Sequence, residues 1–416
     1  MTPSHDSAAA RPAARGSIVA WTVLGLAVVL YFFRFSANTD GLVAITMPVG
    51  ECLMQGERLV TCVTGFPYPP LFALLMVPLT FLPMWARYLA WYAVMVGATY
   101  GCFRICEMLT VRAFRVARED LVWLRLFAIA LSLKFVMSVF ENQAYDVLVF
   151  FFILVGVYGL SENKTFLGAS GMAVAVALKA TPVLMLLYAL WLRKWKVFAL
   201  GVGLCAVLSL LPDVFFTPKD PGSGFLRTWI ADVAFGGVTG TSPEAYYPLV
   251  KEVNFFNHSL KSFLYGVLDG RLSADFAAHK RMVLYLVYLV YGLAALAVLL
   301  LSARVEGALL WGASVVVISM LMLSPMSSKS HFVVLLLPHM AIVAYLLKHR
   351  EVWAAAVPLL IASFVLNSLT SRLFMGRELS IQMLKLGSIT IATLLLLAVV
   401  VVIVFRGRKN PQPVPA

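Results

Sequence analysis

Polar side chains that could do chemistry stand out in this sequence because they interrupt long apolar runs. Asp40 follows the first such run, within Ser36-Ala-Asn-Thr-Asp-Gly41. A carboxylate there could take a proton from an acceptor hydroxyl. The same residue could instead end one helix or cap the next, because Asp and Asn favour both roles. Asp40 is therefore a candidate general base with a competing structural role.

A second polar cluster joins two apolar runs with no hydrophilic loop between them: Glu141-Asn142-Gln143-Ala-Tyr145-Asp146. It is either a solvated turn or a source of hydrogen bonds to a sugar, through Asn142 and Gln143. Lys179 interrupts another apolar stretch, within Lys179-Ala-Thr-Pro182. A lysine in mid-membrane costs about 2.5–3.5 kcal/mol on insertion scales. It must reach the interface or find an anionic partner, and a ligand phosphate is the obvious one.

Two further polar segments lie late in the chain. Lys329 and His331 belong to the turn Ser324-Pro-Met-Ser-Ser-Lys-Ser-His331, which could be structural or could bind a phosphate. Asn257 opens the segment Asn257-His-Ser-Leu260, which starts a short apolar helix reaching about Leu268. No H-E-x-x-H, C-x-x-C or P-loop motif is present.

Composition shows which solvent these residues meet. The 416 residues are 61% hydrophobic and 13% charged, whereas soluble domains are about 45–50% apolar and about 25% charged. This excess excludes a soluble enzyme, a nucleic-acid-binding domain, a disulfide scaffold and a disordered chain. The net charge of +13 fits a membrane protein, because such proteins gather Lys and Arg on the cytoplasmic side.

Hydropathy predicts about ten full spans, because a spanning helix needs about 20 apolar residues. They are 17–33, 86–109, 121–139, 145–160, 197–212, 282–303, 307–323, 331–347, 352–368 and 385–405. The first run is long for a signal peptide, so we expect a retained helix with a cytoplasmic N-terminus. The stretch 164–193 has basic ends and a break at Lys179–Pro182, which favours two half-helices that dip in and return.

Residues 68–83 are apolar but short and rich in proline. If they spanned the membrane, the next helix would deliver Arg112, Arg115 and Arg118 outside, against the positive-inside bias. We therefore expect an interfacial segment and both termini in the cytoplasm. One domain over 1–416 then has two long outer loops, 36–85 and 213–281. The first loop contains Cys52 and Cys62, and its oxidising surroundings predict a disulfide between them.

The order of these features resembles the polyprenol-phosphate-sugar-dependent glycosyltransferases of family eighty-seven, in the GT-C superfamily. The resemblance spans roughly residues 36–335. Its most specific part is Phe66-Pro-Tyr-Pro-Pro-Leu-Phe-Ala-Leu-Leu75, followed by Leu82-Pro83. Best known in that family are actinobacterial α-mannosyltransferases of the phosphatidylinositol mannoside pathway. The resemblance implies an all-α polytopic bundle in a bacterial inner membrane, with its active site on the outer face.

The resemblance also implies roles for single residues. Asp40 takes the family's role of general base in an inverting transfer, and His331, Lys179 and Lys329 would hold the donor phosphate. Tyr68, Asn142, Gln143 and Asn257 would bind substrate. The implied partners are a polyprenyl-phosphate sugar, a glycolipid or glycan acceptor and the bilayer, with no nucleic acid, cofactor or metal. A lipid phosphate is already a stable leaving anion, so a base and cationic cover suffice for the chemistry.

This chain departs from the family's usual motifs in several places. Asn142 and Tyr145 replace a Gly and an Asn, Ser328 and Ser330 stand where a Trp and a His are usual, and Asp40 is a single acid where a pair is usual. Mannose leads as the sugar, ahead of arabinofuranose, galacturonate and other hexoses. The alternatives are a transporter or lipid flippase, which would need acids within several spans, and a ligase of lipid-linked glycans.

Overall fold

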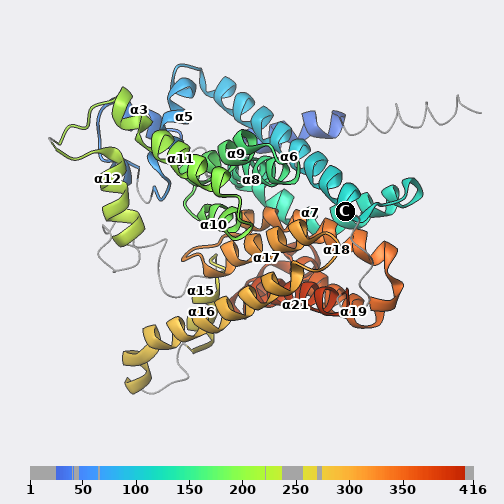
Figure 1. Cartoon of the computed structure of the whole chain (residues 1–416). Coiled ribbons are helices and arrows are strands. Elements are labelled where there is room, and N and C mark those ends of the chain that lie inside the picture. The colour runs from blue at the N-terminus through green and yellow to red at the C-terminus, as the bar shows by residue number, and fades with distance from the viewer. Residues whose placement is uncertain are drawn as a thin grey trace, which may run out of the picture.

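The protein is described here by a computed structural model that covers residues 25–39, 41, 46–63, 66–220, 222–236, 256–268 and 274–407. Every regular element in these ranges is a helix (Figure 1). The first half contains, after the helix Gly25–Ser36, α3 Val49–Met54, α4 Leu59–Cys62, α5 Pro70–Thr80, α6 Met84–Phe114, α7 Leu121–Glu141, α8 Asp146–Ser161, α9 Thr165–Leu178, α10 Val183–Trp191 and α11 Trp195–Phe215. The second half contains α12 Phe225–Trp229, α15 Leu260–Leu268, α16 Ala274–Ser302, α17 Ala308–Leu323, α18 Leu336–Lys348, α19 Trp353–Phe364, α20 Arg372–Lys385 and α21 Ser388–Gly407. Short η segments adjoin several helices: η1 Arg118–Asp120, η2 Ile230–Phe235, η3 Lys329–Leu335, η4 Arg350–Val352 and η5 Val365–Leu369.

Seven of the described helical segments are long and apolar enough to cross a membrane, and they coincide with predicted spans. The predicted spans 145–160 and 307–323 correspond to α8 and α17, which have 16 residues each. At 1.5 Å per residue such a helix is about 24 Å long, less than the hydrocarbon thickness of about 30 Å. The chain is therefore an all-α, multi-pass membrane protein in which two inner helices are shorter than a full span.

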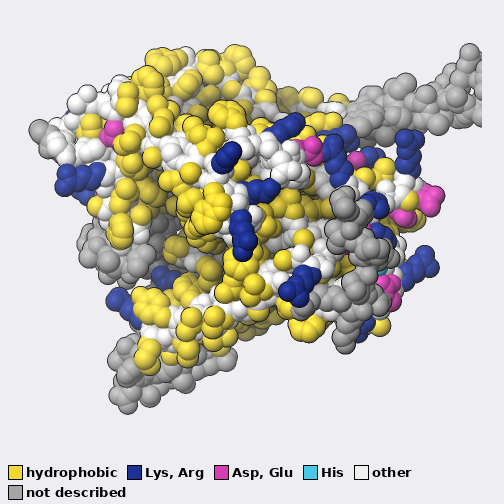
Figure 2. Space-filling model, in the orientation of Figure 1, with side chains coloured by type: hydrophobic (Ala, Val, Ile, Leu, Met, Phe, Trp, Pro, Cys, Tyr) yellow, Lys and Arg dark blue, Asp and Glu magenta, His cyan; other side chains and the backbone are white. Residues whose placement is uncertain are grey.

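The long helices form an inner and an outer layer. The segment Lys329–Lys348 has 89% of its spanning window buried, against 17% for Trp195–Phe215 and 22% for Arg281–Ser302. Outer helices such as α11 and α16 expose large apolar side chains, for example Val214 and Leu293. Figure 2 shows broad hydrophobic patches on one face of the molecule, with Lys and Arg mainly over its middle and right. Apolar side chains that face outward in this way suit contact with lipid.

Helices α8 and α9 form a hairpin in which glycines allow very close packing. A Cβ on Gly159 would lie 2.2 Å from the Gly168 nitrogen, and one on Gly171 would lie 2.6 Å from the Gly156 nitrogen. Small residues are what let two membrane helices approach backbone to backbone. Because the two helices run antiparallel, the start of α8 at Asp146 meets the end of α9 at Lys179.

The predicted break in the stretch 164–193 is present. Helix α9 ends at Leu178, Lys179 is extended with φ −154° and ψ 126°, and α10 begins after Pro182. Proline lacks a backbone N–H and cannot continue the preceding helix, so the chain reverses here. This break places Lys179 at the open end of the α8–α9 hairpin, beside the start of α8.

An ion pair marks the far end of α8, and a second one joins the end of α18 to the turn before α17. Arg112 pairs with Glu162 at 2.5 Å, and Lys348 pairs with Glu306 at 2.6 Å. These residues lie at helix ends and turns that the charge pattern assigns to the cytoplasmic side. Asp146 lies sixteen residues before Glu162, at the opposite end of α8. The polar cluster around Asp146 is thus at the other face of the bundle.

Candidate functional site

A buried ion pair connects the two ends of the α8–α9 hairpin. Lys179 Nζ donates to Asp146 Oδ1 at 2.5 Å, and His331 Nε2 lies 3.6 Å from the same oxygen. The side chains are 6% exposed for Asp146 and 15% exposed for Lys179 and His331. The partner of Lys179 in the structure is therefore a carboxylate of the chain, where the sequence suggested a ligand phosphate.

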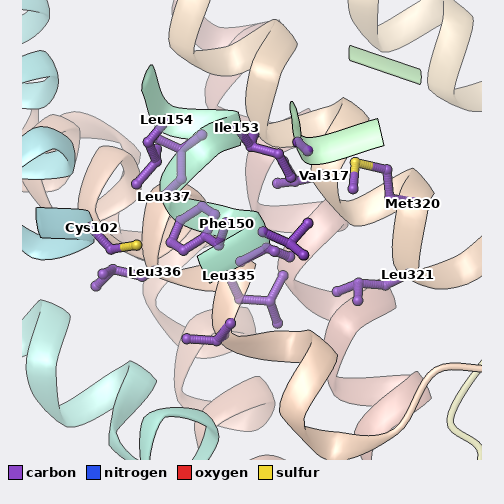
Figure 3. Packing of buried hydrophobic residues seen from close by; sticks show 14 of the residues in the cluster. Cys102, Phe150, Ile153, Leu154, Val317, Met320, Leu321, Leu335, Leu336 and Leu337 are labelled. Atoms are coloured by element: carbon purple, nitrogen blue, oxygen red, sulfur yellow. The ribbon is translucent and has the colours of Figure 1, made fainter. Parts of the chain in front are cut away.

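These three residues line a small cavity together with Thr181, Ser324, Ser327 and apolar side chains of α8 and α17. The cavity has a volume of about 20 Å³, which is room for about one water molecule. The floor is apolar and is formed by Val149 and Ile153 of α8 with Met320 and Leu321 of α17. Figure 3 shows Ile153, Met320 and Leu321 among the packed side chains of the core. An apolar floor strengthens the attraction between the charges above it.

The turn before Asp146 is fixed by Gln143, which has a φ of 54° and is fully buried. Its Nε2 donates to the carbonyls of Phe35 at 2.7 Å and Asn38 at 3.1 Å. In return, Asn38 Nδ2 donates to the Glu141 carbonyl at 2.7 Å. The end of the first helix is thereby bound to the turn between α7 and α8.

This contact bears directly on Asp40, which itself lies outside the described residues. Its neighbour Gly41 is buried so close to Gln143 that a Cβ there would lie 2.1 Å from Gln143 Oε1. Within the described part of the chain, that Oε1 is buried and has no hydrogen-bond partner. The backbone on both sides of Asp40 is thus held against the turn that leads to Asp146.

Tyr68 reaches the same turn through aromatic contacts. Its ring packs edge-on against Tyr145 at 4.7 Å between centroids, and Tyr145 OH donates to the Leu178 carbonyl at 3.2 Å. Pro70 is the first residue of α5, a position that suits proline because its missing N–H is not needed there. The Tyr-Pro-Pro segment therefore supports the Asp146–Lys179 corner from the first outer loop.

Asn257 and Asn142 mainly hold backbone. Asn257 Nδ2 donates to the Pro325 carbonyl at 2.8 Å, and its Oδ1 accepts from Ser327 N at 2.9 Å. Asn142 Nδ2 donates to the Ser138 carbonyl at 2.7 Å. Asn257 is 5% exposed, so the structure gives it a role in shaping the turn that carries Lys329 and His331.

Next to Asn257, His258 is buried with cations around it. Burial, followed by the positive charges of Lys329, Lys134 and His331, lowers the pKa of His258 to about 3. The ring is therefore neutral at physiological pH. Lys134 was not among the predicted candidates, although a lysine inside the predicted span 121–139 is a usable signal.

Contacts join the two long segments 36–85 and 213–281, which the sequence predicts to be outer loops. Arg58 donates to both oxygens of Asp232, at 2.8 and 2.5 Å, and this hydrogen bonding raises the pKa of the guanidinium. Trp229 Nε1 donates to the Pro67 carbonyl at 3.1 Å. Cys52 and Cys62 are joined by a disulfide, with their Cα atoms 6.2 Å apart. These contacts hold the first loop over the site.

The structure thus brings together Tyr68, Gln143, Lys179 and His331 around Asp146, and places Lys329 beside Lys134 and His258. In comparison with known proteins, no curated protein matches the chain. Among solved structures, it is similar to the crystal structure of ArnT from Cupriavidus metallidurans in the apo state, with a TM-score of 0.38 and 16% identity over 94% of this chain and 78% of that chain. The model of glycosyltransferase family 87 matches residues 66–325, which is more than half of the chain, so the chain belongs to this family.

Proposed function

We propose that this glycosyltransferase moves a sugar, with mannose as the leading candidate, from a polyprenyl-phosphate donor to a hydroxyl of a glycolipid or glycan. The reaction takes place on the outer face of a bacterial inner membrane and inverts the anomeric carbon. Asp40 is the general base for the acceptor hydroxyl. The leaving group is a stable lipid phosphate, so the reaction needs cationic cover more than an acid or a metal.

The observation that carries this proposal is the attachment of the Asp40 turn to Gln143. Hydrogen bonds from Gln143 to Phe35 and Asn38, and the close contact with Gly41, hold residues on both sides of Asp40 against Gln143, which precedes Asp146 by three residues. A base works only within about 2.6–3.2 Å of the proton it takes, so a fixed turn suits this role better than a loose loop.

The proposed sidedness follows from the two ends of α8. Glu162 pairs with Arg112 in the last turn of α6, which leads into a loop with Arg115 and Arg118, and such basic loops stay in the cytoplasm. Asp146 and the disulfide-bonded loop then face outside, where a disulfide persists. Both termini are cytoplasmic in this arrangement.

A transporter or flippase would need carboxylates within spans that are available to couple ions. Among the described spans, the buried carboxylate of α6, Glu107, is already paired with Arg125 at 2.7 Å. A ligase of lipid-linked glycans remains the second alternative because of the large outer loop 213–281.

Mass analysis of lipid extracts tests the proposal. Lipids from cells with and without the gene are compared, and then purified protein is given polyprenyl-phosphate donors carrying mannose, arabinofuranose or galacturonate. We expect a glycolipid or glycan that lacks one hexose in the absence of the enzyme, and in vitro transfer from the mannose donor. Transfer from none of these donors would contradict the proposal.

A further inference from the structure

Three cations gather where α7, η3 and α20 lie near one another. Lys134 of α7 interacts electrostatically with Lys329 of η3, and Lys329 interacts with Arg372 at the start of α20. Helix α7 packs against both η3 and η5, and α20 packs against η5. Within the described ranges none of the three forms an ion pair, and Glu141, which interacts with Lys329, is exposed. Positive charge is therefore in excess at this place.

Lys134 lies within a membrane-spanning helix, where an unpaired lysine is costly. Its Nζ donates to the carbonyl of Asn367, which belongs to the π-helical segment η5. One carbonyl satisfies one of the three ammonium donors and supplies no countercharge. Asn367 Oδ1 and Oγ of the next residue, Ser368, are also buried. Neither atom has a hydrogen-bond partner among the described residues.

His258 adds a buried polar atom without a partner. The residue is 2% exposed, and its Nε2 makes no hydrogen bond within the part of the chain that the structure describes. The backbone fixes its position, since its N–H donates to the Ser327 carbonyl at 2.7 Å and its carbonyl accepts from Thr390 Oγ1 at 2.9 Å. Its ring contacts Phe332, which stacks on Phe135, the neighbour of Lys134. A neutral imidazole has one N–H to offer to an anion.

We infer that Lys134, Lys329 and His258 form a binding site for the phosphate of a lipid substrate, with Arg372 at its outer edge. The inference rests on the proposed function and moves the phosphate away from Lys179. Asp146 already neutralises Lys179 and faces His331, so these groups have less attraction left for an anion. By contrast, Lys134, Lys329 and Arg372 form no ion pair with a carboxylate among the described residues.

A lipid tail could lie beside this site. Leu373 and Phe374 follow Arg372 directly and are 86% and 64% exposed. A hydrocarbon chain in the bilayer could rest on them while its phosphate reaches the cations. The phosphate could belong to the polyprenyl donor or to an anionic acceptor lipid, because the recognition chemistry is shared.

Binding of three probes to the purified full-length protein in detergent tests the inference: farnesyl phosphate, farnesol and phosphatidylinositol. The variants are Lys134→Met, Lys329→Met and, as a matched control, Lys385→Met, which removes an exposed lysine at the end of α20. A charge-assisted hydrogen bond contributes about 1.5–3 kcal/mol, so each site variant should weaken phosphate binding about tenfold or more. The control should bind like the wild type, and Lys134→Arg should restore most of the affinity.

The probes separate the sources. A loss limited to farnesyl phosphate assigns the site to the donor, and a loss limited to phosphatidylinositol assigns it to the acceptor. Unchanged binding of both farnesyl phosphate and phosphatidylinositol by the site variants would overturn the inference. An equal loss of affinity for farnesol, which has no phosphate, would overturn it too. Lys329→Met keeps the test valid if Lys134→Met fails to fold, because Lys329 Nζ makes no hydrogen bond or ion pair within the described residues. Sugar transfer is assayed separately, so a wild type that binds phosphate but transfers no sugar would contradict the proposed function alone.

Discussion

Lys179 and Asp146, 33 residues apart in sequence, form a buried ion pair of 2.5 Å at the open end of the α8–α9 hairpin. Two helix ends meet here because glycines bring the helices together, and the charges meet because each helix end carries one of them. The pair links the Tyr-Pro-Pro segment, through Tyr145, to the turn that carries His331. It is the structural centre of the candidate site.

Removing one charge of this pair should destabilise the folded protein more than removing both. Lys179→Met leaves Asp146 buried without its lysine, and breaking a buried pair costs about 3–5 kcal/mol. The double variant Lys179→Met/Asp146→Asn should regain part of that loss. Thermal unfolding of the purified variants in detergent measures the coupling. Two losses that simply add in the double variant would show that the residues act independently.

Gly41→Ala should disable the enzyme without unfolding it. The new Cβ would lie 2.1 Å from Gln143 Oε1, so Gln143 must move and release Phe35 and Asn38. Displacing a catalytic turn by about 1 Å can cost about 10²-fold in rate. The matched control is Gly97→Ala in α6, where nothing lies within 4 Å of the added Cβ. If Gly41→Ala and Gly97→Ala transfer sugar equally well, the contact between Gly41 and Gln143 is not needed for activity.

The cysteines of the first outer loop should be found oxidised. Mass spectrometry after alkylation without reductant is expected to recover a peptide pair linked through Cys52 and Cys62. In the chain-entropy model, a loop of this size contributes about 2–3 kcal/mol, so replacing both residues by serine should lower the unfolding temperature. Alkylation of both thiols before reduction would contradict the prediction.

Acid should destabilise the protein through His258. The folded-state pKa is about 3, below the ordinary value of 6.5, so the unfolded state binds more protons between these values. Stability is therefore complete above 6.5 and falls as the pH is lowered through this window. The unfolding temperature of His258→Gln should depend less on pH than that of the wild type. If the unfolding temperatures of both proteins fall equally with pH, His258 is not the group that makes the protein sensitive to acid.

The helical architecture could be predicted because lipid imposes simple rules on sequence. Long apolar runs marked most spans, and Pro182 with Lys179 marked the break between α9 and α10. The short length of α8 and α17 was harder to foresee, because hydropathy does not show that neighbouring helices enclose them. The buried fraction of Lys329–Lys348 is likewise a property of packing.

The site was predicted less completely because side-chain pairing depends on how helices cross. Sequence indicated that Lys179 needed an anion, but Asp146 becomes that anion only when Gly159 and Gly168 let α8 and α9 approach. Asparagine often binds substrates, which made Asn257 a candidate from sequence. In the structure its side-chain amide holds the Pro325–Ser327 turn. Lys134 was overlooked inside a span, although its charge alone marked it for attention.

The role of Asp40 is the central claim, and sugar transfer by Asp40→Asn tests it most directly. Asn keeps the shape of the side chain and removes its basicity, whereas a capping residue would tolerate Asn about as well as Asp. Purified wild type and variant are given polyprenyl-phosphate mannose and a lipid acceptor, and product is measured beside binding of farnesyl phosphate. We predict that Asp40→Asn binds farnesyl phosphate normally and forms no product. Product formed at the wild-type rate would contradict the account and move the base to another carboxylate, with Glu51 or Asp146 next to be tested.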